Sequence, residues 1–191
     1  MDSSANARAA PALRGRPYCL PIPGVRASQE GIDVATRLGV LQDSTLIARR
    51  LTSAQFKLVA TPGYFGEHGR PRSLDDLAKH NCLAFTSRDT RLTRDWRFLV
   101  GGEETKLTPR GAMSFSDGGA LCEAACAGYG LAQMHDYYLD HEIARGKLVT
   151  VLDKLKPRPD PIWLVYPPTR HLTPKVRAFV DFMTAQFRAE P

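Results

Sequence analysis

The chain has 191 residues, and its proportions of 43% hydrophobic and 24% charged residues are typical of a globular protein and exclude disorder throughout. No run of about 18 apolar residues occurs, so the sequence predicts no membrane-spanning helix. The formal net charge is +6, but the basic residues are scattered and follow no helix-turn-helix, zinc-finger or RNA-recognition pattern. They predict a solvated surface and no direct DNA binding.

The first 30 residues differ in composition from the rest of the chain. They are rich in alanine, arginine and proline, and Pro11, Pro17, Pro21 and Pro23 exclude a regular helix or central strand through most of them. Arginines also fall where the apolar core of a signal peptide would lie. We therefore predict an irregular leader over residues 1–30 and a cytoplasmic location.

From about residue 31 strand-like and helix-like patterns alternate. Period-two alternation and short apolar runs predict strands at 32–39, 43–51, 55–61, 82–86, 96–100, 104–109, 112–116, 130–134, 147–152 and 162–167. Capping residues and apolar positions at helical spacing predict helices at 73–80, 117–127, 136–145 and 173–188. This order of elements predicts an α/β fold.

The four cysteines are Cys19, Cys82, Cys122 and Cys126. In a cytosolic protein of this size we expect reduced thiols. Cys122 and Cys126 share one face of a predicted helix, but no second pair with metal-ligand spacing accompanies them. We predict buried thiols, no metal and no other cofactor.

Residues 114–133, SFSDGGALCEAACAGYGLAQ, place a serine, an aspartate and two glycines directly before a small-residue helix. Free N–H groups at a helix start attract a carboxylate or phosphate, and Gly118 and Gly119 would let a ligand approach the backbone closely. Ser116 could donate its hydroxyl to that anion, whereas Asp117 would instead accept from a hydroxyl or amine. The alternative is that Ser116 or Asp117 simply caps the helix.

A collinear series of motifs resembles the regulatory domain of LysR-type transcriptional regulators. The series runs through LVATPGYFGEHGRPRSLDDLAKHNCLAF, SDGGAL, AGYGLAQM and IWLVYPPTRHLTPKVRAFVDFM, and it covers residues from about 31 to 187. The resemblance implies an α/β, type-2 periplasmic-binding-protein-like fold with two lobes around a cleft. It also implies an N-terminally truncated member, because the winged helix-turn-helix and the first strand–helix–strand of lobe one have no counterpart here.

The same resemblance implies a division of the chain into lobes. Residues 31–67 and 167–191 would form lobe one, which is incomplete, and residues 68–166 would form lobe two with a crossover strand. The chain would cross between the lobes near residues 62–68 and again near residues 162–166.

Candidate effector-binding residues lie at predicted strand ends and at the helix start. By resemblance Ser116, Asp117 and Gly118 face the effector cleft. Strand ends, where α/β sheets usually hold ligands, add the remaining candidates: Arg37, Gly39, Phe85, Thr86 and Met134. The alternatives are a surface position for Arg37 and core packing for Phe85.

The motifs favour a regulatory function over catalysis. His135 and Asp136 could suggest acid–base chemistry, but no nucleophile or metal ligands accompany them, so we expect no enzyme. The resemblance implies an effector-sensing domain that binds a small anionic metabolite. It would reach DNA only through an N-terminal domain absent from this chain, and it would form a homodimer or homotetramer in the full-length family. A solute-binding protein of the same fold, which would need a secretory signal, and a non-functional truncated remnant are the alternatives.

Overall fold

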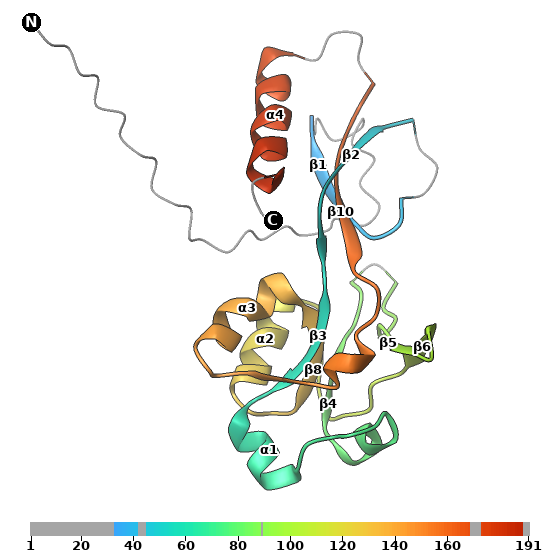
Figure 1. The fold of residues 1–191 in the computed structure, drawn as a ribbon, viewed down its shortest axis with the longest axis vertical. Coiled ribbons are helices and arrows are strands. Elements are labelled where there is room, and N and C mark those ends of the chain that lie inside the picture. The colour runs from blue at the N-terminus through green and yellow to red at the C-terminus, as the bar shows by residue number, and fades with distance from the viewer. Residues whose placement is uncertain (1–32, 42–44, 89, 169–172, 189–191) are drawn as a thin grey trace, which may run out of the picture.

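The structure is a computed structural model, and it describes residues 33–41, 45–88, 90–168 and 173–188. The expected irregular leader lies outside these residues. The described chain forms two units that follow one another along the long axis of the molecule (Figure 1). We call them the upper unit, built on a three-stranded sheet, and the lower unit, built on a five-stranded sheet.

The upper unit is an antiparallel sheet with a helix on one face. Its strands stand in the order β1 (Ala35–Leu38), β10 (Asp160–Tyr166) and β2 (Ile47–Ala54). Helix α4 (Pro174–Arg188) begins where the Thr173 carbonyl accepts from Val176 and Arg177, with proline at the first helical position as expected. Its buried valines pack against Leu164 and Tyr166 of β10.

The lower unit is built on a mixed sheet. The strand order is β7 (Ser114–Phe115), β4 (Cys82–Phe85), β8 (Leu131–His135), β3 (Phe56–Ala60) and β9 (Val149–Val151). Strands β7, β4 and β8 are mutually parallel, whereas β3 runs antiparallel to β8 and β9. The carboxyl ends of β7, β4 and β8 therefore lie at one edge of the sheet.

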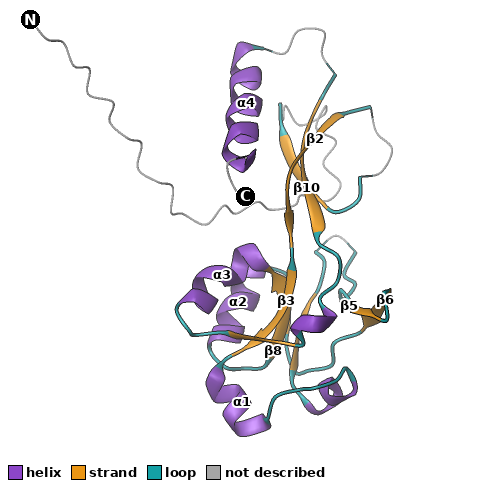
Figure 2. Ribbon diagram, viewed as in Figure 1, coloured by secondary structure: helices purple, strands orange, loops and turns teal. Residues whose placement is uncertain are grey.

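Both faces of this sheet are covered, which explains why its strands are apolar on alternate and intervening positions alike. Helices α2 (Gly118–Cys126) and α3 (Asp136–Ala144) cover one face, as Figure 2 shows. The other face packs against several shorter elements: α1 (Pro62–His68), the 3-10 turns at Asp75–Lys79 and Asp153–Leu155, and the hairpin of β5 (Trp96–Val100) and β6 (Glu103–Leu107).

Helix α1 was not among the predicted elements. The sequence predicted a strand that ends at residue 61 and a crossing between the lobes near residues 62–68, and these residues form a helix of the lower unit. Its signals are present in the sequence, because the Thr61 hydroxyl accepts from the Tyr64 N–H at 3.1 Å and Pro62 occupies the first turn. Glycines at positions 63, 66 and 69 concealed it, since glycine is a poor helix former.

Sheet membership also differs from the expected boundaries. Strand β3 lies in the five-stranded sheet although we assigned residues 31–67 to lobe one, and β10 lies in the three-stranded sheet although we assigned it to lobe two. The chain passes from the upper to the lower sheet at Gln55 and returns between Leu155 and Asp160. We propose that these two passages, rather than residues 62–68 and 162–166, separate the lobes.

Candidate functional site

The carboxyl edge of β4, β7 and β8 lies at the junction of the two units. Phe56, the first residue of β3 below the passage, pairs with His135, the last residue of β8. A loop leaves β4 at this edge, and α2 and α3 begin there directly after β7 and β8. In α/β proteins this edge is the usual place for a ligand.

The start of α2 carries three of the expected site residues. Asp117 caps the helix, because its Oδ1 accepts from the Ala120 N–H at 2.9 Å. The exposed Ser116 accepts at its Oγ from Arg88 Nε at 3.3 Å. A Cβ on Gly118 would lie 2.4 Å from Cζ of Tyr138. The close approach that we expected for a ligand at Gly118 is therefore made by the Tyr138 ring.

Strands β4 and β8, together with the residue that follows β4, supply three more expected residues, whose surroundings differ. The Thr86 hydroxyl bonds to that of Ser114, which ends up beside it because β4 and β7 are parallel neighbours. Phe85 packs partly against the core, and the Arg94 guanidinium lies over its ring at 4.7 Å. Met134 is only 4% exposed and packs in the core under α2 and α3, so it is a packing residue in this structure.

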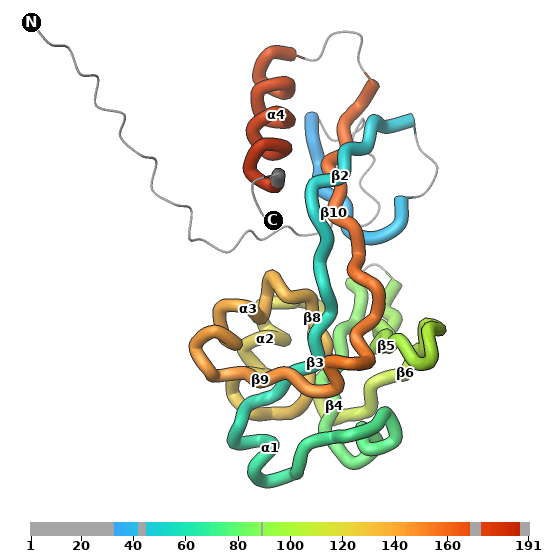
Figure 3. Tube along the Cα trace, viewed as in Figure 1, coloured from blue at the N-terminus to red at the C-terminus, as the bar shows by residue number. Residues whose placement is uncertain are grey.

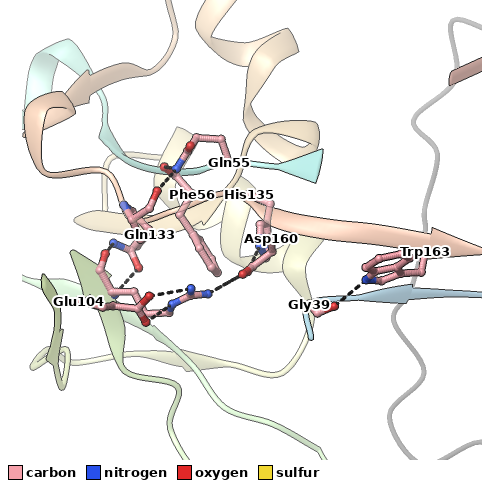
Figure 4. Close-up of polar contacts among 10 residues, drawn as sticks. Gly39, Gln55, Phe56, Glu104, Gln133, His135, Asp160 and Trp163 are labelled. Atoms are coloured by element: carbon pink, nitrogen blue, oxygen red, sulfur yellow. Dashed lines mark hydrogen bonds and ion pairs between the residues drawn. The ribbon is translucent and has the colours of Figure 1, made fainter. Parts of the chain in front are cut away.

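Arg37 and Gly39 lie across the junction, in the upper unit. Gly39 has φ +90°, a conformation that favours glycine, and its N–H donates to the Pro161 carbonyl at 2.9 Å. The indole of Trp163 donates to the Gly39 carbonyl at 2.9 Å (Figure 4). Arg37 stands opposite Trp163 in the sheet. The structure therefore gathers six expected residues on the lower unit and leaves these two at the base of the upper sheet.

Sequence reasoning missed the polar network at the junction, whose centre is Arg97 of β5. Its Nη1 lies 2.8 and 2.9 Å from the two carboxylate oxygens of Asp160, and its Nε and Nη2 donate to Glu104 at 2.7 and 3.1 Å. The hydrogen bonds that Arg97 donates to Glu104 and to Asp160 raise the pKa of Arg97 above its ordinary value. Burial acts to raise the pKa of Asp160, but hydrogen bonds from His135 and Arg97 outweigh it and hold that pKa below its usual range.

His135 joins this network from β8. It is 4% exposed, its Nε2 lies 3.1 Å from Oδ2 of Asp160, and its ring stacks on Phe56 with centroids 3.8 Å apart (Figure 4). Its sequence neighbour Asp136 instead accepts from the Gln55 N–H at 3.0 Å. The two residues do not form an acid–base pair, and both contribute to the junction.

The two passages between the units are tied together. Gln55 Nε2 donates to the Pro157 carbonyl at 2.8 Å, so the descending and the returning segments lie side by side, as Figure 3 shows. Gln55 and Asp136 also exchange two hydrogen bonds. The Gln55 N–H donates to the Asp136 carboxylate, and the Asp136 N–H donates to the Gln55 carbonyl at 2.9 Å. The sequence does carry one signal of this network. Gln55, Arg97 and Asp160 are polar residues, and each directly precedes a mainly apolar run.

The thiols follow the expectation within the described residues. Cys82 and Cys122 are buried and Cys126 is half-buried, and no disulfide joins these three. Burial raises the pKa of Cys82 to about 11 and that of Cys122 to about 12. Cys19 lies outside the described residues. Across residues 33–41, 45–88, 90–168 and 173–188, no three His, Cys, Asp or Glu side chains are placed to hold a metal ion.

Among the same residues, no helix combines the length and the apolar character that crossing a bilayer requires.

Comparisons with known proteins agree with the motif series. Residues 24–188 match the LysR substrate binding domain family. The chain is 34% identical over 157 residues to the HTH-type transcriptional regulator CrgA of Neisseria meningitidis serogroup C (strain 8013), which covers 81% of this chain and 51% of that protein. It is 30% identical over 169 residues to the HTH-type transcriptional activator AaeR of Escherichia coli K12, covering 88% and 53%. The chain thus spans about half the length of the curated relatives it matches.

Solved structures give the same answer for the fold. The CrgA regulatory domain from Neisseria meningitidis is 29% identical, with a TM-score of 0.73 over 84% of this chain and 78% of that chain. Full-length AphB of Vibrio cholerae is 28% identical, with a TM-score of 0.73 over 86% of this chain and 54% of that chain. The expected α/β, periplasmic-binding-protein-like fold is confirmed. The chain belongs to the LysR family of transcriptional regulators, through their substrate-binding domain.

Proposed function

We propose that this chain is the effector-sensing part of a cytoplasmic transcriptional regulator and that its effector is a small anionic metabolite. Membership of the family supports the regulatory part of this proposal, because LysR-type regulators control transcription, bind small-molecule effectors and DNA, and act as oligomers. In this proposal the chain senses the effector, and a helix-turn-helix segment outside it contacts DNA. Assembly is as a homodimer or homotetramer.

The observation that carries the proposal is the position of the carboxyl edge of β4, β7 and β8 at the junction of the units. Hydroxyls of Thr86, Ser114 and Ser116 line this edge beside the capped start of α2. Hydroxyls and helix-start N–H groups bind anions, and the two sheets offer opposite walls. Arg37 and Gly39 would form the upper wall in this arrangement.

Effector binding at a junction can control a second site only if the effector binds one arrangement of the units better than another. A ligand held by both walls favours the arrangement in which they are close. An attached DNA-binding segment, read through an oligomer, would then respond to that bias. The two tied passages at Gln55 and Pro157 are the segments about which the units would move.

The test is a thermal-denaturation screen of the full chain against metabolites, each acid being paired with its neutral amide. We expect at least one acid to raise Tm and its amide to leave Tm unchanged. Binding should then alter transcript levels in the source organism only when the gene is intact. If no acid or amide in a broad panel raises Tm, the chain is not an effector-sensing domain.

A further inference from the structure

The loop that joins β4 to β5 carries three arginines, Arg88, Arg91 and Arg94. None of them forms an ion pair with another described residue. Arg97, a few residues further along, instead contacts two carboxylates. The loop over residues 86–94 sets three arginines against one aspartate, and its formal charge is therefore +2. We call residues 86–94 the arginine loop.

Hydrogen bonds join the described residues of the arginine loop, 86–88 and 90–94. Thr86 and Thr93 form a bridge between its two arms, and Ser87 N–H donates to the Leu92 carbonyl at 3.0 Å. Arg91 at the turn has φ +56°, a left-handed conformation that costs a residue other than glycine about 1 kcal/mol. These bonds hold the backbone of Arg91 and Arg94 beside the carboxyl end of β4.

The two outer arginines reach different parts of the candidate site. Arg88 donates from Nε to Ser116 Oγ at 3.3 Å, which places its guanidinium at the start of α2. Because Ser116 accepts this bond, its own proton stays available to an anion. Arg94 lies over the Phe85 ring at 4.7 Å, and its N–H donates to the Phe85 carbonyl at 2.7 Å.

The surroundings of the Arg94 side chain also affect its pKa. Its side chain is exposed to solvent, yet desolvation lowers its pKa, and the Asp160 carboxylate of β10 acts on that pKa in the opposite direction. Both observations hold for a cation that is open to water but surrounded at a short distance by the junction. Such a cation gains more from a bound anion than a fully solvated one, because the dielectric around it is lower.

We propose that the effector carries two negative groups, one held by Arg88 together with Ser116 and the other by Arg94 above Phe85. This rests on the proposed function and adds to it the charge of the ligand and the residues that recognise it. Guanidinium groups bind carboxylates and phosphates through paired hydrogen bonds, so both classes of dianion fit. Arg91 contributes its charge from the turn; among the described residues, no hydrogen bond or ion pair joins its side chain to the site.

A small ligand fits these observations better than nucleic acid does. The two outer arginines converge on hydroxyls and an aromatic ring at the ligand edge of a sheet. Nucleic-acid surfaces instead present many cations along an extended face. Duplex DNA is therefore included in the test as the competing occupant.

The experiment measures Tm of the full chain at about pH 8 and constant ionic strength with succinate, inorganic phosphate or acetate. At about 20 mM we expect succinate, which carries two separate carboxylates, to raise Tm by about 3 °C, and acetate to raise it by less than about 1 °C; inorganic phosphate, a single group with two charges, should have a smaller effect than succinate. The rise should disappear in Arg88→Gln and in Arg94→Gln. It should persist in the matched control Arg110→Gln, whose exposed side chain lies elsewhere on the lower unit. Each variant's Tm without ligand shows that it is folded.

The possible failures separate the two proposals. If both glutamine variants keep the full rise, or if acetate equals the dianions, the inference is wrong while the proposed function stands. If only neutral compounds of the broad panel raise Tm, the inference fails together with the anionic character of the proposed effector, and only the effector-sensing role stands. If no compound of any kind does, both proposals fail. Binding of a random-sequence duplex that is lost in Arg88→Gln and Arg94→Gln, without any effect of the dianions, would assign the loop to nucleic acid instead.

Discussion

Arg97 and Asp160 join the two units of the fold through a two-oxygen contact of 2.8 and 2.9 Å. Arg97 belongs to a hairpin of the lower unit, and Asp160 is the first residue of the strand that returns to the upper sheet. Both side chains are largely buried, at 25% and 16% exposure. Removing one partner leaves the other charge poorly solvated, so the pair is a sensitive point in the structure.

Asp160→Asn is therefore expected to lower the free energy of unfolding by about 2 kcal/mol. The amide keeps the shape of the carboxylate but not the charge that Arg97 and His135 contact. Urea denaturation followed by circular dichroism measures the effect. Asp75→Asn, at an exposed position, is the control and should change stability by less than about 0.5 kcal/mol. Equal stabilities of the two variants would show that the Arg97–Asp160 contact contributes nothing.

The same contact predicts a dependence on pH. Because the folded pKa of Asp160 lies below its unfolded value, the contact stabilises the fold above the ordinary aspartate pKa of about 3.9. The stabilisation is lost as pH falls through the lower folded pKa. The difference in free energy of unfolding between the unaltered chain and Asp160→Asn should thus be constant near neutrality and shrink below about pH 4. If this free-energy difference instead grows as the pH falls, the folded pKa of Asp160 is not lowered.

Gly118→Ala should destabilise the chain by about 2 kcal/mol, because the new methyl group meets the Tyr138 ring at 2.4 Å. Gly66→Ala is the control: nothing lies within 4 Å of its Cβ, and alanine favours the helix there. In a Tyr138→Ala background the cost of Gly118→Ala should largely vanish. If the cost is the same in both backgrounds, the ring is not its cause.

Thiol reactivity offers a further test. In Cys19→Ser, whose three remaining cysteines all lie in the described structure, we expect Cys126 to react first with a disulfide reagent at about pH 8. Cys82 and Cys122 should react only after the chain unfolds, because burial raises the pKa of both thiols and keeps the reagent from reaching them. Mass spectrometry of the labelled protein identifies the sites. Rapid native labelling of Cys122 would contradict the burial of its side chain against α3.

Local patterns predicted most of the elements, because caps and apolar periods act within a few residues. The aspartate and glycines at 117–119 predicted the start of α2, and Gly101 and Gly102 predicted the β5–β6 hairpin. The 73–80 helix appears as a shorter 3-10 turn at Asp75–Lys79, with Ser73 Oγ accepting from the Asp76 N–H at 3.3 Å.

Contacts between distant residues were beyond such patterns. Tyr138 follows Gly118 by a whole helix and a strand, and it reaches that glycine only because α2 and α3 pack side by side. Asp160 meets Arg97 across 63 residues. The unit to which β3 and β10 belong depends on pairing partners, not on their own composition. Whether the expected site residues bind an effector stays a prediction.

Two segments of the chain connect the units, and the hydrogen bond from Gln55 to Pro157 joins these segments to each other. Two separate links would let the upper unit slide as well as tilt, whereas bonded links restrict it to bending and twisting about one short axis. Few degrees of freedom mean that little entropy is lost when the units are fixed in one arrangement. In the proposed function, a small ligand with few contacts to contribute would therefore be enough to set the orientation of the upper unit.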